Sequence, residues 1–285
     1  MNVFQLIKSV LDEIYRRIPS DEATKDKQIA GKMVALSQAY RKLAEKGVPH
    51  DYADAVTRFA YIYVYVTSHA SVVYQLIRDN APLRACAALK QLFDEEQLSI
   101  TCIGGGPGSD FLGILKYIIK KKKTPRLKLN LFDREPAWNE CWSDVDDKLK
   151  MAISNNFTPF DVTEPDTWKP FDKFLSSDLF TMIYFMSEIN SLREQADAFF
   201  EYLFENAKPG SLILYVDNNN KTFYEWFDSL IAKYKWQVLV SGEENLKIDD
   251  YSEEKTDLEP YYSKFKKERK PKLEANIAYR VCQKQ

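Results

Sequence analysis

Four glycines lie within five positions of one short segment: Gly104, Gly105, Gly106 and Gly108. The chain contains only nine glycines. Glycine is costly inside regular structure, so this spacing indicates a backbone that turns tightly and lets a ligand approach closely. A strand-like run precedes the turn and a helix-like run follows it. The turn is therefore the first candidate for a ligand site.

The spacing of these glycines distinguishes two kinds of nucleotide site. A dinucleotide fingerprint has the form G-x-G-x-x-G, in which the third glycine permits close packing of a helix against a strand. Counting from Gly104 puts Ser109 at the third position, and counting from Gly106 puts Phe111 there. The sequence instead has G-x-G-x-G at Gly104, Gly106 and Gly108. This pattern disfavours an oxidoreductase that binds a dinucleotide.

Acidic residues follow the next two strand-like runs. Asp133 ends the run LKLNLFD, where a carboxylate can accept hydrogen bonds from both ribose hydroxyls of a nucleoside. Its alternative role is to cap the helix that follows. The distance along the chain from the glycine turn favours the ribose role. Asp161 follows a third, shorter run, and its alternative role is to form a turn.

The elements that position these residues divide the chain into two parts. Through residue 97 the apolar residues recur at intervals of three and four, which is helical periodicity. From Leu98 onward strand-like and helix-like runs alternate, which predicts crossover units, a mostly parallel sheet and an α/β fold. The expected strands are 98–103, 127–133, 179–186, 210–217, 236–242 and 274–282, together with a short strand and loop within 153–162. The expected helices are 110–120, 135–149, 193–207 and 221–234.

Composition restricts the function classes. The chain has 285 residues, 45% of them hydrophobic, and a formal net charge of −2, which argues against a protein that coats nucleic acid by bulk charge. The amino-terminal segment lacks the apolar core of a signal peptide, and no run approaches the ~18 apolar residues of a membrane span. The four cysteines are scattered without zinc-ligand spacing. We expect a cytoplasmic or nuclear protein with no metal site and no membrane partner.

Residues 98–285 resemble class I S-adenosylmethionine-dependent methyltransferases, whose seven-stranded sheet ends in an antiparallel hairpin. The G-x-G-x-G turn, the order of the acidic residues and the final pair of strands with no helix between them carry this resemblance. It implies a Rossmann-like methyltransferase domain over residues 98–285 and S-adenosylmethionine as the cofactor. Residues 1–97 are then an all-helical extension of the kind that caps the substrate side.

The resemblance also implies a set of cofactor contacts. The glycine turn passes beside the amino-acid moiety of the cofactor, Asp133 holds the ribose, and Asp161 accepts a hydrogen bond from the adenine amino group while the backbone amide of Val162 reads the ring. Members of the family usually have an acid two residues before the first glycine, where this chain has Cys102. Asp110 is an available carboxylate for the cofactor's amino group, although stabilising a helix amino terminus explains it equally simply.

Methyl transfer from a sulfonium depends mainly on orientation, because the leaving group is already activated. In the resembling family the residues that select the acceptor follow the fourth strand, which here places Phe185, Ser187 and Glu188 beside the methyl group. Glu188 is the candidate general base, against a helix-capping or surface role. Asp217, at the end of the fifth strand, is the second candidate, against simple turn formation. The absence of an N-P-P-Y or D-P-P-Y sequence disfavours the amino-methylating enzymes that use it.

The aromatic and histidine residues of the extension allow two interpretations. Tyr61, Tyr63 and Tyr65 have the spacing of a buried core, and stacking on a substrate is the alternative. His50 and His69 are too isolated to form a metal site or a nucleophilic triad, so structural roles are expected.

The basic segment 264–272, KFKKERKPK, is expected at the carboxyl ends of the strands, where it can contact phosphates. An acidic run precedes it and can neutralise it. The helical extension and two short segments, AYIYVYVTSHASVVYQLI and IGGGPGSDFLG, also resemble fungal enzymes that methylate uridine N3 in large-subunit ribosomal RNA. RNA is therefore the leading acceptor. A small metabolite or a protein side chain is the alternative, and a catalytically silent binding module, suggested by Cys102, is a different class of function.

Overall fold

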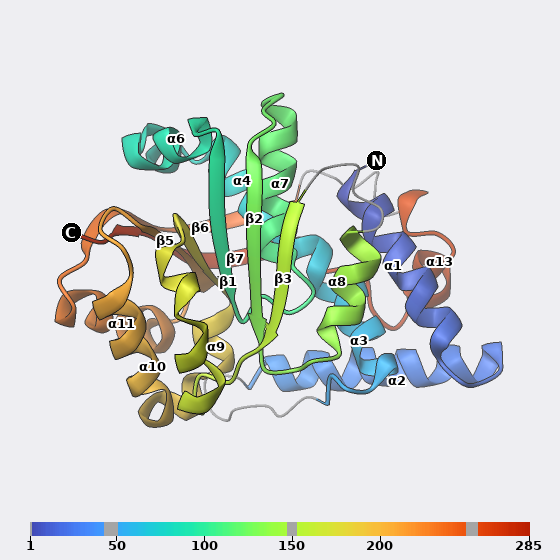
Figure 1. Ribbon diagram of the computed structural model, residues 1–285. Helices are drawn as coiled ribbons and strands as arrows, with labels where there is room; N and C mark the ends of the chain where they lie inside the picture. Colours follow the sequence, from blue (N-terminus) through green and yellow to red (C-terminus); the bar gives the residue numbers. More distant parts are fainter. Residues whose placement is uncertain (1, 43–50, 147–152, 249–255) are drawn as a thin grey trace.

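The computed structural model describes residues 2–42, 51–146, 153–248 and 256–285. Within these residues a seven-stranded sheet has the order β3-β2-β1-β4-β5-β7-β6 (Figure 1). Strands β1 to β5 run parallel, and β7 runs antiparallel to both β5 and β6. The expected α/β fold with an antiparallel final strand is confirmed. The strands are β1 Gln97–Ile103, β2 Arg126–Asp133, β3 Ile153–Pro159, β4 Leu179–Ile183, β5 Leu212–Asn218, β6 Gln237–Lys247 and β7 Glu274–Gln283.

The register of the parallel strands aligns their carboxyl ends. Ile103 at the end of β1 pairs with Phe132 of β2, and Asp133 pairs with Pro159 at the end of β3. The turns that follow these strands therefore meet at one edge of the sheet, which is the lower edge in Figure 1. Ligands of open α/β sheets bind at this edge.

Helices cover both faces of the sheet (Figure 1). Apolar residues of α4, α7 and α8 form one buried cluster with strand side chains of one sheet face. Residues of α10 and α11 form a second cluster with strand side chains of the other face. The connections after β1 and β4 thus lead to opposite faces, which makes the carboxyl ends of these two strands a topological switch point. The bounds are α7 Ser109–Lys120, α8 Trp138–Asp146, α10 Arg193–Asn206 and α11 Lys221–Lys233.

The described part of the amino-terminal extension is helical, as expected. Its elements are α1 Val3–Arg17, α2 Glu22–Tyr40, α3 Ala55–Tyr61, a π-helix over Ile62–Val66, α4 Thr67–Asp79, α5 Ala81–Ala85 and α6 Ala87–Asp94. Helix α4 packs directly on α7: a Cβ atom added to Gly113 of α7 would lie 2.5 Å from the carbonyl oxygen of Ala70. The extension therefore shares its core with the sheet, and α2 lies beyond the carboxyl edge (Figure 1).

The largest difference from the expected elements is at the fourth strand. The sequence predicts a strand over 179–186, but β4 ends at Ile183 because Tyr184 has a left-handed backbone conformation, with φ of 58°. Phe185–Glu188 then form the one-turn helix α9. The third strand ends at Pro159, within the short strand and loop expected at 153–162. Strand β6 continues beyond its expected end to Lys247 because it pairs with β7 along this length.

The remaining elements are short. They are 3-10 helices at Pro165–Thr167, Lys169–Ser176 and Asn190–Leu192, and helix α13 at Tyr261–Phe265. The expected helix 135–149 begins at Trp138, and its last residues lie outside the described part. His50 also lies outside the described residues.

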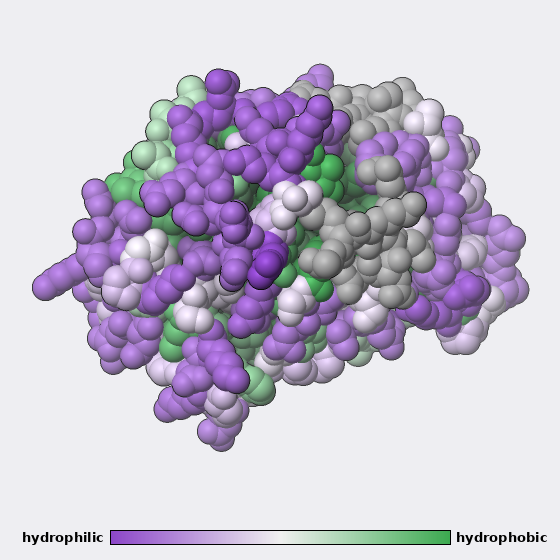
Figure 2. All heavy atoms as spheres, turned by 45° about the horizontal axis from the view of Figure 1, so that its top comes forward, coloured by the Kyte–Doolittle hydropathy of each residue, from purple (hydrophilic) through white to green (hydrophobic). Residues whose placement is uncertain are grey.

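The surface that Figure 2 brings forward, toward the amino ends of the parallel strands, is mostly hydrophilic, and its hydrophobic atoms gather in small areas. In the described ranges we find no helix that combines the length and the apolar character needed to cross a membrane. All four cysteines are buried and free.

Candidate active site

The glycine turn follows β1 at the carboxyl edge of the sheet. Gly104, Gly106 and Gly108 have φ values of +65°, +48° and +84°, a region that L-residues with side chains rarely adopt. Neighbouring side chains also leave no room for a Cβ atom at two of these glycines. A Cβ added to Gly104 would lie 2.3 Å from Phe185 Cδ2, and one added to Gly108 would lie 2.7 Å from the Trp142 ring. The three alternate glycines are therefore required by their conformation, and two of them also by packing.

Asp133 connects the end of β2 to this turn. One carboxylate oxygen accepts a hydrogen bond from the Gly106 N–H (2.9 Å), and the other accepts one from the Glu135 N–H (3.0 Å). Burial raises the pKa of the Asp133 carboxyl to about 6, although both backbone donors oppose this shift. The alternative role of Asp133 is to cap the following helix, but α8 begins only at Trp138, so the contact with Glu135 stabilises the turn before this helix. The contact with Gly106 holds the carboxylate beside the glycine turn.

A cavity of about 350 Å³ opens between the glycine turn, the ends of β2 and β3, and the amino-terminal helices. Seven of the residues expected to form the site line it: Gly104, Gly106, Asp133, Asp161, Val162, Phe185 and Glu188. The other lining residues are Tyr40, Tyr52, Tyr61, Arg134, Glu135, Trp138, Phe160, Ile189, Ser191 and Leu192. The cavity thus combines a backbone turn, three acidic positions that follow different strands and an aromatic wall.

Asp161 and Val162 lie side by side on the cavity wall. One carboxylate oxygen of Asp161 accepts hydrogen bonds from the backbone N–H (2.9 Å) and the hydroxyl (2.7 Å) of Thr163, which is the turn-forming role. Within the described ranges no residue accepts a hydrogen bond from the Val162 N–H. This amide is available to a ligand.

Five expected site residues do not line this cavity: Gly105, Gly108, Asp110, Ser187 and Asp217. Asp110 is only 1% exposed and lies behind the turn, where it accepts hydrogen bonds from the hydroxyls of Thr181 (2.7 Å) and Ser109 (3.3 Å). Burial raises the pKa of the Asp110 carboxyl to about 7. Cys102 is fully buried beside it, with its thiol pKa raised by burial.

Asp217 does not line the cavity but contacts the backbone of the helix that carries Glu188. Its carboxylate is fully buried and accepts hydrogen bonds from the N–H groups of Ser187 (2.9 Å) and Asn218 (2.7 Å). The contact with Ser187 ties the single turn of α9 to the end of β5 and so fixes the backbone that carries Glu188. Burial raises the pKa of the Asp217 carboxyl to about 6.

Glu188 faces the cavity within a chain of hydroxyl groups. The Tyr40 hydroxyl donates a hydrogen bond to Glu188 Oε1 (2.8 Å), and the hydroxyls of Tyr40 and Tyr52 lie 2.7 Å apart. Burial raises the pKa of the Glu188 carboxyl to about 7, and the hydrogen bond from Tyr40 opposes this shift. A carboxyl that titrates near neutral pH is suited to accept a proton during catalysis.

Sequence analysis did not identify Tyr40, Tyr52 or Trp138 as site residues. The rings of Tyr52 and Tyr61 lie 5.0 Å and 5.5 Å from that of Trp138, measured between centroids. Tyr61 and Tyr63 are each expected either in the core or in contact with a substrate. Tyr63 is a core residue, whereas Tyr61 is buried but also lines the cavity. No sequence motif marks Tyr40 or Tyr52, because only the packing of the extension brings them to the carboxyl edge.

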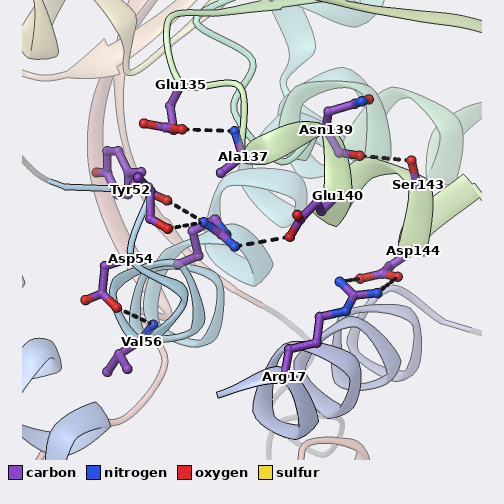
Figure 3. Close-up of polar contacts among 12 residues, drawn as sticks. Arg17, Tyr52, Asp54, Val56, Glu135, Ala137, Asn139, Glu140, Ser143 and Asp144 are labelled. Atoms are coloured by element: carbon purple, nitrogen blue, oxygen red, sulfur yellow. Dashed lines mark hydrogen bonds and ion pairs between the residues drawn. The ribbon is translucent and has the colours of Figure 1, made fainter. Parts of the chain in front are cut away.

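Ion pairs and backbone contacts hold the extension over the cavity. The guanidinium of Arg58 donates hydrogen bonds to the carbonyl oxygens of Tyr52 (2.7 Å) and Ala53 (2.8 Å), and it reaches Glu140 of α8 at 3.3 Å. Arg17 of α1 forms a bidentate pair with Asp144 of α8, with both distances 2.9 Å. Figure 3 shows that α8 receives these contacts along one side, so the segment that carries Tyr52 is fixed in place.

A second cavity, of about 190 Å³, adjoins the first at Tyr40, which lines both. Its other lining residues are Ser37, Arg41, Tyr65, His69, Tyr184, Ser187, Asn218, Arg269 and Lys272. A larger cavity of about 700 Å³ lies between α5, α6 and α7, toward the amino ends of the strands. It contains neither the glycine turn nor an acidic strand end, so its size does not indicate a cofactor site.

The basic segment 264–272 divides between two environments. Lys264 pairs with Glu22 (2.5 Å) and Asp26 (2.9 Å) of α2, so this cation is neutralised within the protein. Arg269 and Lys272 instead line the second cavity. Only part of the segment is therefore directed toward the site.

No family model and no curated protein matches the sequence. Similar solved structures include a candidate RNA methyltransferase from Pyrococcus horikoshii, with 12% identity over 87% of this chain and 98% of that chain, and a TM-score of 0.44. They also include a precorrin-6y methyltransferase from Geobacter metallireducens, with 13% identity over 71% and 87% of the two chains and a TM-score of 0.41. A methylase of 16S ribosomal RNA has 12% identity over 75% and 91%, with a TM-score of 0.40.

These neighbours are methyltransferases with different substrates, and at such identities the likeness concerns the fold alone. None of them is described as a fungal enzyme of ribosomal RNA. The finer resemblance to that group has no support from these comparisons.

Proposed function

We propose that this chain is an S-adenosylmethionine-dependent methyltransferase that binds its cofactor in the 350 Å³ cavity. The observation that supports this most strongly is the hydrogen bond from the Gly106 N–H to Asp133 (2.9 Å), because the carboxylate proposed to bind the ribose lies directly beside a left-handed glycine turn. The switch point between β1 and β4 is the expected place for such a ligand.

The lining residues fit the parts of this cofactor. The turn at Gly104 and Gly106 leaves backbone exposed beside the amino-acid moiety, and Asp133 can accept the ribose hydroxyls. Asp161 lies beside the adenine position, and the free N–H of Val162 can donate to the ring. Asp110 can contact the cofactor only after its hydrogen bond with Thr181 is exchanged.

The cofactor supplies a methyl group on an activated sulfonium. The contribution of the chain is to orient the acceptor and to remove its proton. Glu188 is the proposed base, because its carboxyl faces the cavity and titrates near neutral pH. Tyr40 positions this carboxyl through its hydroxyl (2.8 Å), and Asp217 positions the α9 backbone, so Asp217 acts as a positioning residue.

RNA is the proposed acceptor, because Arg269 and Lys272 bring positive charge from segment 264–272 to the site. A small metabolite or a protein side chain is the competing acceptor, and the enclosing aromatic wall of the extension favours a small one. A catalytically silent module would bind the cofactor without transferring its methyl group.

Calorimetry tests the cofactor assignment. The protein should bind S-adenosylmethionine and its demethylated product but not NAD. Tight binding of NAD without binding of the sulfonium cofactor would overturn the proposal. Cofactor binding without methyl transfer to RNA, metabolite or protein fractions would favour the silent module.

A salt titration tests the RNA acceptor. Replacing Lys266, Lys267, Arg269 and Lys270 together with Ser should lower the slope of log affinity against log salt by somewhat under one unit for each phosphate that the variant no longer neutralises. Affinity for S-adenosylmethionine should not change, since these residues do not line the cofactor cavity. An unaltered slope would leave these basic residues without a role in RNA binding and would favour a small acceptor.

A further inference from the structure

The second cavity concentrates positive charge at the inner end of the site. Arg41, at the end of α2, lines it together with Arg269 and Lys272, which precede β7. None of these three forms an ion pair with any residue in the ranges that the structure describes. The buried Nε atom of Arg269 has no hydrogen-bond partner there either. Arg41 is exposed at the rim of the cavity, whereas Arg269 and Lys272 are half-buried. A half-buried cation without an anionic partner is unfavourable unless a ligand supplies the negative charge.

Lys272 is held firmly in this position. Its backbone N–H donates to the carbonyl oxygen of Val64 in the π-helix (2.8 Å), and its ammonium group lies 5.3 Å from the centre of the Tyr184 ring. Burial lowers the pKa of Lys272, and the nearby charge of Arg269 lowers it further. Asp217 opposes this shift, but its carboxylate already accepts the N–H groups of Ser187 and Asn218.

The opposite wall of the cavity is aromatic and strained. The ring of Tyr184 stacks on His69 with 4.1 Å between centroids, and the buried Tyr184 hydroxyl has no hydrogen-bond partner among the described residues. Burial and the charge of Lys272 lower the pKa of His69 well below its usual value, so its ring is neutral. The left-handed backbone of Tyr184 is a strain of the kind that clusters at functional sites. The cavity therefore combines cationic side chains with an aromatic wall that contains a buried hydroxyl without a hydrogen-bond partner among the described residues.

The two cavities adjoin at the proposed catalytic group. Tyr40 lines both, and its hydroxyl donates to Glu188 in the first cavity. In the single turn of α9, Ser187 lines the second cavity and Glu188 the first. A ligand held in the second cavity would thus extend past Tyr40 toward the base and the cofactor.

We propose that the second cavity is an anion subsite that holds a phosphate group of the methyl acceptor through Arg41, Arg269 and Lys272. This inference rests on the proposed function, since it treats the neighbouring cavity as the cofactor site. Three cationic side chains in about 190 Å³ match a phosphate better than the single charge of a carboxylate. The phosphate comes either from an RNA backbone or from a phosphorylated small molecule.

Inorganic phosphate is the direct probe of this subsite. Calorimetry should show binding to the full chain, and the double variant R269Q/K272Q should weaken it by about tenfold or more, because charge-assisted hydrogen bonds are removed. The matched control K120Q/K128Q removes the same charge from exposed positions outside the cavity and should bind phosphate normally. Acetate should bind more weakly than phosphate. Equal phosphate affinity in both double variants, or acetate binding as tight as phosphate binding, would overturn the subsite.

Thermal denaturation provides a second measurement. Lys272→Met should not lower the melting temperature without phosphate, because it removes a partly buried cation that has no anionic partner among the described residues. Phosphate should raise the melting temperature of the wild type and of Lys272→Arg more than that of Lys272→Met. An equal phosphate response in Lys272→Met and the wild type would contradict the proposal.

Two further ligands distinguish the source of the phosphate. A nucleoside 5′-monophosphate that loses as much affinity in R269Q/K272Q as inorganic phosphate does identifies a small phosphorylated acceptor. A short oligoribonucleotide that loses affinity in this variant, when the mononucleotide does not bind, identifies an RNA backbone. Binding of S-adenosylmethionine is measured in every variant. Its failure would reject the proposed function, whereas normal cofactor binding without a phosphate effect would reject the subsite alone.

Discussion

Asp133 serves two neighbours at once, because its two carboxylate oxygens accept the N–H groups of Gly106 and Glu135. Replacing it with Ala should weaken S-adenosylmethionine binding by about 1.5 to 3 kcal/mol, the cost of losing hydrogen bonds to a charged acceptor. Calorimetry measures this effect, and Glu96→Ala, just before β1, is the control for removal of one carboxylate. Unchanged affinity in a folded Asp133 variant would limit this residue to its turn-stabilising role.

Glu188 gives a pH-dependent prediction. Its carboxyl pKa is raised from 4.5 to about 7 in the folded protein, so the folded state binds a proton more readily than the unfolded state does. The stability that this group contributes is therefore complete below about pH 4.5 and is lost as pH rises through about 7.

Glu188→Gln removes this titration. The stability of the wild type relative to the variant should fall by roughly 1 to 3 kcal/mol between about pH 4.5 and about pH 8, because each pKa unit corresponds to about 1.4 kcal/mol and partial solvation reduces the total. Chemical denaturation across this range measures the difference, and the other raised carboxyl groups cancel because both proteins contain them. A constant difference across the range would place the Glu188 carboxyl in an environment that does not raise its pKa.

At this scale the sequence predicted the residues that belong to local motifs. The glycines and Asp133 could be found because their spacing follows from one strand, one turn and the next strand. Tyr40 and Tyr52 could not be assigned, because they reach the site through long-range packing. The position of Asp110 behind the turn could not be predicted either, since its direction depends on contacts with Thr181 of β4.

At the scale of elements, the crossing of α4 and α7 ties the extension to the sheet. Gly113→Ala should destabilise the protein by about 1 to 3 kcal/mol, because the added Cβ would lie 2.5 Å from the Ala70 carbonyl oxygen and 2.7 Å from Val73 Cβ. Gly31→Ala, in α2, is the matched control: no atom lies within 4 Å of its added Cβ, so it should stabilise the protein by about 0.5 to 1 kcal/mol. Denaturant titration measures both. A neutral Gly113 variant would show that α4 can move away from α7.

The alternation of strand-like and helix-like runs predicted the order of the elements. It did not predict the residues at which they end. The apolar run 179–186 reads as one strand, whereas β4 stops at Ile183. The N–H of Tyr184 still bonds to the carbonyl oxygen of Val216 (2.7 Å), and Asp217 then accepts the N–H of Ser187 in α9. The strand ends because Tyr184 adopts a left-handed backbone conformation, and the Asp217 contact with α9 comes from a distant part of the sequence. The local sequence contains no signal for either.

For the whole molecule, the sequence predicted the α/β class, the helical extension and the antiparallel last strand. It divided the chain at residues 97 and 98, and this division stays a prediction, although one buried cluster includes residues from both sides. Helices α2 and α3 cover the carboxyl edge of the sheet and thereby enclose the candidate site. This covering follows from contacts such as Arg58 with Glu140 and Arg17 with Asp144, which join residues 82 and 127 positions apart in sequence.

Hydrogen exchange on addition of S-adenosylmethionine tests the central claim most directly, because it reports both binding and its location. Saturating cofactor should slow amide exchange in the glycine turn, residues 104–108, and in residues 161–164 after β3, while NAD should change neither. Residues 77–94, which border the 700 Å³ cavity, should exchange at the same rate with and without cofactor. Protection confined to residues 77–94, or no protection anywhere at saturating cofactor, would contradict a cofactor site at the carboxyl ends of β1, β2 and β3.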